Sequence, residues 1–238
     1  MTAVGAPKRG GPQEIPRPDG WLPGEPSPWA ALEDRAVTLD GILRVLDGRR
    51  PVGIRGRPKG DEREAGVLVA LYEDLEGGGP HVVLTRRSPR LASHSHEVSF
   101  PGGRRDPGDP DLWATALREA AEEIGLDPEV PRLVGHLDPL VTVGSRSLIH
   151  PFVAVLPGPP ELVPNPAEVE AVLLVPLAEL LLDEVYREEE WARFDVPWII
   201  TFFELEGDTV WGATAAMLRQ LLVLSLGVAD RRNYRVDP

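Results

Sequence analysis

The chain contains short apolar runs of the length expected for β-strands. Two of them, AGVLVALYE and HVVLTRR, enclose the glycine-rich segment DLEGGGP, so residues 65–87 are predicted to form an antiparallel hairpin. EVSF, which precedes two glycines, is predicted to be a further short strand.

Within residues 101–126 the apolar spacing then changes to that of a helix with two different faces. One side is apolar: Trp113, Ala116, Leu117, Ala120 and Ile124. The other side carries three carboxylates: Glu119, Glu122 and Glu123. Asp109 or Asp111 can cap the start of this helix, and Gly125 suits the left-handed residue that commonly follows a helix end.

Strand patterns return after this helix and are followed by a second hairpin and a closing helix. The β-rich runs are RLVGHLDPLVTV, LIHPFVAVLP and VEAVLLVPL. A short helix is expected at PLAELLL, a hairpin at WIITFFELEGDTVW and an apolar final helix at GATAAMLRQLLVLSLG. This order of elements predicts an α+β fold, a mixed sheet sandwiched between helices.

The two ends of the chain differ from this central part. Residues 1–28 are rich in proline and glycine and are predicted to be a disordered tail, because they can bury little apolar surface. One domain is expected over residues 29–228, beginning with one or two short helices that end at Gly48. Residues 229–238 are expected to form a C-terminal tail.

Charge and composition narrow the classes of partner. The formal net charge of -13 disfavours a general nucleic-acid or membrane-surface binder, so a small-molecule partner is expected. The chain has no cysteine, which removes disulfides, thiolate nucleophiles and thiolate zinc sites. Neither a secretory signal pattern nor an apolar run of membrane-spanning length is present, so a cytoplasmic location is expected.

The acidic helix face suggests chemistry rather than a solvated surface. Like charges at helical spacing repel by roughly 0.2 to 0.5 kcal/mol per pair, and Arg118 is the only nearby cation in the helix. Mg²⁺ takes oxygen ligands, which carboxylates on one rigid helix supply at fixed spacing. The preceding loop FPGGRRDPGD contains Gly102 and Gly103, whose backbone can approach a phosphate closely.

The stretch REAAEEIGL, residues 118–126, resembles the second half of the Nudix box at every specified position. The first half departs from the box, because its acidic position is Asp109 rather than Glu and eight residues rather than seven separate it from Arg118. The same variation is familiar in the coenzyme A diphosphatase branch of the Nudix hydrolases. This resemblance implies the Nudix fold and a hydrolase of nucleoside diphosphate conjugates that uses Mg²⁺ or Mn²⁺.

An upstream signature of that branch also resembles this chain, over residues 84–103. The matching positions are Leu84, Thr85, Arg87, Ser88, Leu91, His94, Val98 and Phe100 to Gly103. Ala92 and His96 depart from it, standing where the signature has Arg and Gly. The resemblance implies hydrolysis of coenzyme A or its thioesters to phosphopantetheine and adenosine 3',5'-bisphosphate. ADP-ribose or a reduced dinucleotide such as NADH is the alternative substrate, and a non-catalytic nucleotide sensor is the alternative function.

The same resemblance assigns roles to individual residues. Glu119, Glu122 and Glu123 are the expected metal ligands, with Glu122 and Glu123 also counted as catalytic. Arg118 is counted with the catalytic group, with positioning of the loop or of a carboxylate as the alternative. Glu168 is the expected general base, and Glu170 or a solvated loop acid the alternatives.

Substrate contacts are expected from four residues: Arg87, His94, Gly102 and Gly103. For His94 a structural hydrogen bond is the alternative. Arg86 and Arg90 could join Arg87 on a 3'-phosphate, although surface solvation is the alternative for each. The expected partner is a nucleotide diphosphate, and a homodimer is left open as the assembly.

Overall fold

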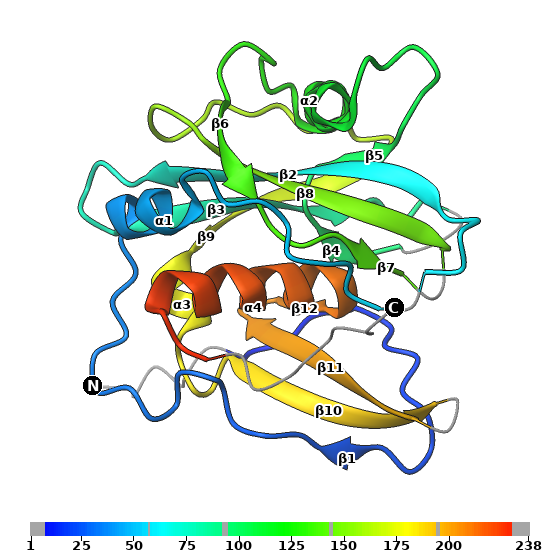
Figure 1. Cartoon of the computed structure of the whole chain (residues 1–238), viewed down its shortest axis with the longest axis vertical. Coiled ribbons are helices and arrows are strands. Elements are labelled where there is room, and N and C mark those ends of the chain that lie inside the picture. Colours follow the sequence, from blue (N-terminus) through cyan, green and yellow to red (C-terminus); the bar gives the residue numbers. More distant parts are fainter. Residues whose placement is uncertain (1–7, 57, 92–94, 143–144, 194–195, 230–238) are drawn as a thin grey trace.

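The computed structural model describes residues 8–56, 58–91, 95–142, 145–193 and 196–229. Over these residues the elements lie in layers (Figure 1). Helix α2 covers one face of the larger sheet, and α1 and α4 cover the other face. The smaller sheet lies beyond α4. The predicted α+β fold with a mixed sheet between helices is therefore confirmed, with a second sheet added.

The larger sheet is mixed because two of its long strands run in parallel. β2 pairs with β8 in parallel, whereas β3 pairs with β2 and with β9 in antiparallel fashion. Its strands are β2 (Arg63–Glu73), β3 (Pro80–Arg87), β4 (Val98–Ser99), β5 (Gly102–Arg104), β6 (Arg132–His136), β7 (Leu140–Val141), β8 (Ser147–Val155) and β9 (Val169–Pro176). The β2–β3 hairpin is the one predicted from the sequence.

The smaller sheet is antiparallel, with the strand order β1, β10, β11, β12. Its strands are β1 (Leu22–Pro23), β10 (Tyr186–Arg193), β11 (Val196–Leu205) and β12 (Asp208–Trp211). The hairpin between β11 and β12 was predicted. Strand β10 was not, because YREEEWAR lacks an apolar alternation.

The helices are α1 (Leu39–Leu46), α2 (Leu112–Ile124), α3 (Leu177–Leu180) and α4 (Gly212–Leu226). Thr38 caps α1 by accepting a hydrogen bond from the amide of Gly41. Helix α4 is apolar nearly all round because it lies between the two sheets. None of the helices in the described ranges is long and apolar enough to cross a membrane.

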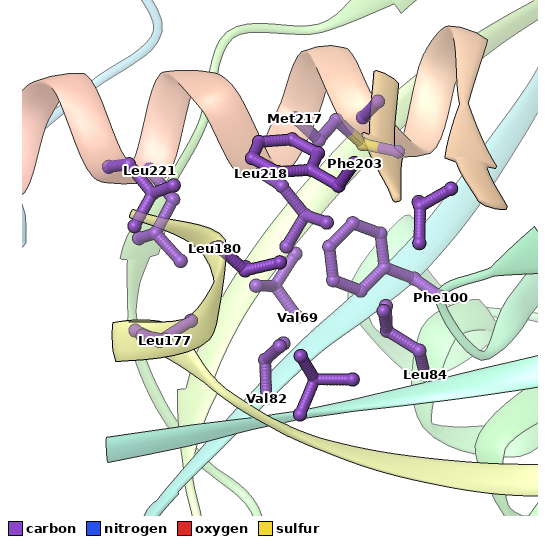
Figure 2. Close-up of a cluster of buried hydrophobic side chains, with 14 of the residues drawn as sticks. Val69, Val82, Leu84, Phe100, Leu177, Leu180, Phe203, Met217, Leu218 and Leu221 are labelled. Carbon is purple, nitrogen blue, oxygen red and sulfur yellow. The ribbon is translucent and has the colours of Figure 1, made fainter. Parts of the chain in front are cut away.

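Two apolar clusters hold these layers together. The larger one fills the space between the larger sheet and α4, with Val69, Leu84, Phe203 and Leu218 among its members (Figure 2). The smaller one lies between the sheet and α2 and includes Leu68. Strand β2 reads as a continuous apolar run because its two faces contribute to different clusters.

Residues 8–28, the N-terminal strap, lie against the smaller sheet rather than forming the predicted disordered tail. The amide of Gly10 donates to the carbonyl of Leu205, and β1 pairs with β10. Arg17 forms an ion pair with the buried Glu189. The composition pointed to disorder because it reports apolar burial, whereas this segment is held mainly by polar groups of the sheet. The remaining parts of the predicted tails, residues 1–7 and 230–238, lie outside the described residues.

Candidate active site

Helix α2 begins and ends where the sequence predicts. The side chain of Asp111 accepts a hydrogen bond from the amide of Ala114, and Gly125 ends the helix with a φ of 67°. The helix lies very close to β2, because a Cβ added to Gly66 would stand 2.2 Å from the carbonyl oxygen of Leu112. This close approach fixes the height of the acidic helix face above the sheet.

Asp109 does not cap the helix but binds Arg118. The guanidinium donates through Nε to Oδ1 at 3.0 Å and through Nη2 to Oδ2 at 3.1 Å. Thr115 donates to the same carboxylate at 2.9 Å. These hydrogen bonds, those of Arg118 first, hold the pKa of Asp109 well below its usual range. Arg118 also donates to the carbonyl of Arg104, so it ties α2 to β5. This geometry matches the positioning role of Arg118.

The three predicted metal ligands of α2 stand in different surroundings. The side chain of Glu123 is buried, and it accepts a hydrogen bond from the amide of Gly102 at 3.2 Å. Glu119 is half-buried. The side chain of Glu122 is 55% exposed and accepts a hydrogen bond from Arg118 at 3.0 Å. The helical period puts the three carboxylates in one sector, but packing against the sheet determines which of them is buried.

Burial disfavours the charged forms of Glu119 and Glu123, although Arg118 donates a hydrogen bond to Glu119 at 3.0 Å. Burial, helped by the neighbouring charges of Glu119 and Glu168, raises the pKa of Glu123 to about 7 against the opposing effects of Gly102 and Arg87. Burial likewise raises the pKa of Glu119. A site in which carboxylates raise one another's pKa values attracts a divalent cation, since its charge removes the repulsion.

The donor set therefore fits a hard divalent cation in its chemistry. Within the described ranges, no group of three or more His, Cys, Asp or Glu side chains has the arrangement of a metal site. Glu122 is directed toward Arg118 rather than toward Glu123. Glu119 also accepts a hydrogen bond from Arg118, at 3.0 Å, so Arg118 holds two of the three predicted metal ligands.

Arg87 stands at the edge of this acidic group. Its Nη1 lies 4.0 Å from Oε1 of Glu123. Its Nε is buried and has no hydrogen-bond partner among the described residues. A buried donor without a hydrogen-bond partner costs free energy, so binding of an anion by this guanidinium is favoured.

The structure separates the two candidate bases. Glu168 acts electrostatically on both Glu119 and Glu123. Glu170 instead accepts a hydrogen bond from Arg86 at 3.1 Å. Glu168 lies in the turn just before β9, whereas Glu170 lies on the strand itself. Of the two, Glu168 is the carboxylate whose charge acts on the acidic helix face.

The two predicted phosphate-binding glycines belong to β5. They pair with β2, and the amide of Gly102 is directed to Glu123. A Cβ added to Gly103 would lie 2.5 Å from the carboxylate of Glu119. The glycines thus make room for Glu119 and for β2, and their contact with a phosphate stays a prediction.

The other predicted substrate contacts have mixed outcomes. Arg86 binds Asp208 at 2.8 Å as well as Glu170, so it links the two sheets and its charge is already paired with carboxylates of the protein. Arg90 is exposed. His94 lies outside the described residues. The contact of Asp109 with Thr115 was missed, because a Thr within a helix gives no sequence signal of a carboxylate beside it.

Comparison with known proteins agrees with this geometry. The family model described as NUDIX domain matches residues 62–195, more than half of the chain. The chain belongs to the Nudix hydrolase family. The matched segment contains α2 and the strands beneath it, so the acidic helix face is the Nudix helix face.

Individual relatives extend the likeness beyond that segment. The chain is 42% identical over 193 residues to Nudix hydrolase 22, chloroplastic, of Arabidopsis thaliana, covering 79% of this chain and 62% of the relative. It is 39% identical over 161 residues to the uncharacterized Nudix hydrolase NudL of Photorhabdus laumondii subsp. laumondii, covering 68% of this chain and 84% of the relative. The chain spans 62% and 56% of the length of two plant relatives.

A MutT/nudix family protein from Enterococcus faecalis is also similar in structure. The TM-score is 0.46 at 14% identity, over 72% of this chain and 70% of the other.

Proposed function

We propose that this Nudix protein is a metal-dependent hydrolase that cleaves the diphosphate bond of coenzyme A or its thioesters. The observation that carries the proposal is the group of carboxylates formed by Glu119, Glu123 and Glu168, which lies beside Arg87, whose buried Nε has no hydrogen-bond partner among the described residues. The clustered carboxylates favour binding of a cation, and the unpaired buried donor of Arg87 favours binding of an anion. A metal-bound diphosphate supplies both.

The carboxylates of α2 would hold Mg²⁺ or Mn²⁺: Glu119, Glu122 and Glu123. When bound, the ion neutralises charge on the diphosphate oxygens and lowers the pKa of a bound water. Arg87 would bind a phosphate oxygen and orient the anhydride. The oxygen of the water attacks one phosphorus, the bond from that phosphorus to the bridging oxygen breaks, and Glu168 accepts the proton of the water.

The assignment of the base can be tested by two variants. We expect Glu168→Gln to lower kcat and to remove the acidic limb of the pH–rate profile, because the proton acceptor is lost. Glu170→Gln should keep that limb, since Glu170 is bound to Arg86 instead. A profile that loses its acidic limb only in Glu170→Gln would transfer the role to Glu170.

Coenzyme A or a thioester of it is the proposed substrate because of residues upstream of α2. Leu84, Thr85, Arg87 and Ser88 match the branch signature, and phosphopantetheine and adenosine 3',5'-bisphosphate would be the products. Ala92 and His96 depart from it, which favours ADP-ribose or NADH as the second candidate. A small-molecule substrate in the cytoplasm fits the formal charge of -13 better than nucleic acid or a membrane.

A substrate panel tests the proposal. Coenzyme A, acetyl-coenzyme A, ADP-ribose and NADH are incubated with the protein and Mg²⁺, and products are identified by mass spectrometry. Glu122→Gln serves as the inactive control. We expect turnover of coenzyme A to the two named products. Turnover of ADP-ribose alone would overturn the branch assignment, and tight binding without turnover of any compound would favour a nucleotide sensor.

A further inference from the structure

The stem of the loop between β3 and β4 connects the candidate base to Arg87. The stem consists of Arg87, Ser88, His96 and Glu97. The amide of Arg87 donates to the carbonyl of Glu97 at 2.9 Å, and the amide of His96 donates to the carbonyl of Arg87 at 3.2 Å. The amide of Ser88 donates to the carbonyl of Glu168 at 2.8 Å. A displacement of the stem would therefore move Arg87 relative to Glu168.

A residue of the N-terminal strap holds this stem from the side of the smaller sheet. The amide nitrogen of Gln13 donates to the carbonyl of His96 at 2.8 Å and to Oδ1 of Asp208 at 2.9 Å. Its amide oxygen accepts from the backbone amide of Thr209 at 2.8 Å. Gln13 is 8% exposed. Both donors and the acceptor of one buried side chain are thus used to join the strap, β12 and the loop stem.

The backbone at His96 shows that this point of the stem is under constraint. His96 has a φ of 61°, in the left-handed region that glycine adopts more readily than a residue with a Cβ. Its Nδ1 lies 3.3 Å from Oε2 of Glu170, which Arg86 also binds. Arg86 in turn binds Asp208, the carboxylate that Gln13 contacts. Glu170 contacts the side chain of His96 and Gln13 binds its carbonyl. Such contacts on both sides keep an unfavourable backbone conformation in place.

We propose that Gln13 is a positioning residue of the active site, which fixes Arg87 through the carbonyl of His96. The proposal rests on the proposed function, because Arg87 is taken to bind the diphosphate. The strap is then a part of the substrate site, although its sequence resembles a tail. Loss of the Gln13 contact lets the stem move, so that the substrate binds less well while the carboxylates of α2 stay in place.

Hydrogen exchange measures the effect of Gln13 on the loop stem without an activity assay. We compare the full-length wild type with Gln13→Ala, Gln13→Glu and Arg17→Ala by mass spectrometry of peptides that cover residues 86–99. Gln13→Glu keeps the acceptor for Thr209 and loses both donors. Arg17→Ala is the matched control, because Arg17 anchors the same strap to Glu189 and is not bonded to the loop stem in any described contact.

The expected result is faster exchange in the stem for both Gln13 variants, by about threefold or more, and unchanged exchange there for Arg17→Ala. Steady-state kinetics should show KM for coenzyme A raised about three- to tenfold in the Gln13 variants, with kcat within about twofold. Arg17→Ala should leave KM within about twofold, even where its Tm falls as far as that of Gln13→Ala.

Three results would overturn the proposal: unchanged stem exchange in both Gln13 variants, an equal rise of KM in Arg17→Ala, or a fall in Tm of Gln13→Ala with unchanged KM. A wild type that is inactive on every diphosphate would sink the proposed function instead. In that event hydrogen exchange, together with the equilibrium affinity for ADP-ribose, decides whether Gln13 positions the stem.

Discussion

Buried glutamates lie on opposite sides of α4, in the smaller sheet and on α2, and they differ in their positively charged partners. In the smaller sheet Glu189 is 1% exposed and is bound by Arg17, Arg187 and the indole of Trp191. On α2 Glu123 is 3% exposed, yet it accepts a hydrogen bond from one backbone amide and has its nearest guanidinium 4.0 Å away.

The neighbouring Glu188 repeats the pattern of the smaller sheet. It accepts a hydrogen bond from the hydroxyl of Tyr186, and Arg219 on α4 lies 3.3 Å from it. Burial raises the pKa of Tyr186, so its proton stays on the hydroxyl. The buried carboxylates of the smaller sheet are thus compensated by arginine within the chain. On α2, Arg118 binds Glu119 and Glu122, whereas the buried Glu123 has no guanidinium of the described residues within hydrogen-bond distance. Buried carboxylates with arginine partners hold a fold together, whereas buried carboxylates without them favour a ligand.

The largest expected effect is the loss of turnover on neutralising the α2 carboxylates. Glu122→Gln and Glu123→Gln should each lower kcat/KM with Mg²⁺ by about 100-fold or more, because a carboxylate ligand is lost while the fold is kept. Glu129→Gln, at an exposed position after α2, is the control and should stay within about twofold. Turnover near the wild-type rate in both variants would remove these residues from the metal site.

The second prediction concerns the pH dependence of stability in EDTA. The pKa of Glu123 is raised to about 7 in the folded chain from 4.5. The folded state therefore binds more protons between these values, and wild type loses stability as pH rises through 7. Compared with wild type, Glu123→Gln should be equally stable near pH 4.5 and more stable by roughly 3 kcal/mol at pH 9.

Urea unfolding of both proteins at several pH values measures this difference. A constant difference from pH 5 to 9 would show that Glu123 titrates normally. Addition of Mg²⁺ should stabilise wild type more than Glu123→Gln, since the ion then compensates the ionised carboxylate.

Glu189→Gln tests the role of a buried carboxylate that has arginine partners, in the smaller sheet. It leaves Arg17 and Arg187 without their shared carboxylate, and a loss of about 2 kcal/mol of unfolding free energy is expected, because both guanidinium groups are partly exposed and can be rehydrated. The kcat of the folded variant should change less than about threefold. A large fall in kcat at full stability would show that the smaller sheet takes part in the chemistry.

The smallest effect is expected from the glycine that touches Glu119. Gly103→Ala places a Cβ against that carboxylate, which can rotate away, so turnover should fall about tenfold with little change in Tm. Gly108→Ala is the matched control, because no described atom lies within 4 Å of its added Cβ. Equal activity of the two variants would mean that the position of Glu119 does not matter.

Much of the fold could be predicted because local patterns specify it. The β2–β3 and β11–β12 hairpins, α2 with Asp111 and Gly125 at its ends, and the apolar α4 all follow from periodicity and turn residues. Strand β10 and the strap could not be predicted in this way. Their polar groups are satisfied by partners far along the chain, such as Arg17 with Glu189 and Gln13 with Asp208.

The spacing of Glu119, Glu122 and Glu123 along the chain is enough to place them on one helix face, because the helical period depends only on spacing. The sequence also carried the Nudix pattern around them. Tertiary contacts were needed to show that Glu123 is buried beside Arg87, that Asp109 binds Arg118 and that Glu170 is bound by Arg86. The physical reason is that burial and charge pairing depend on which elements lie side by side, and these elements come from distant parts of the chain.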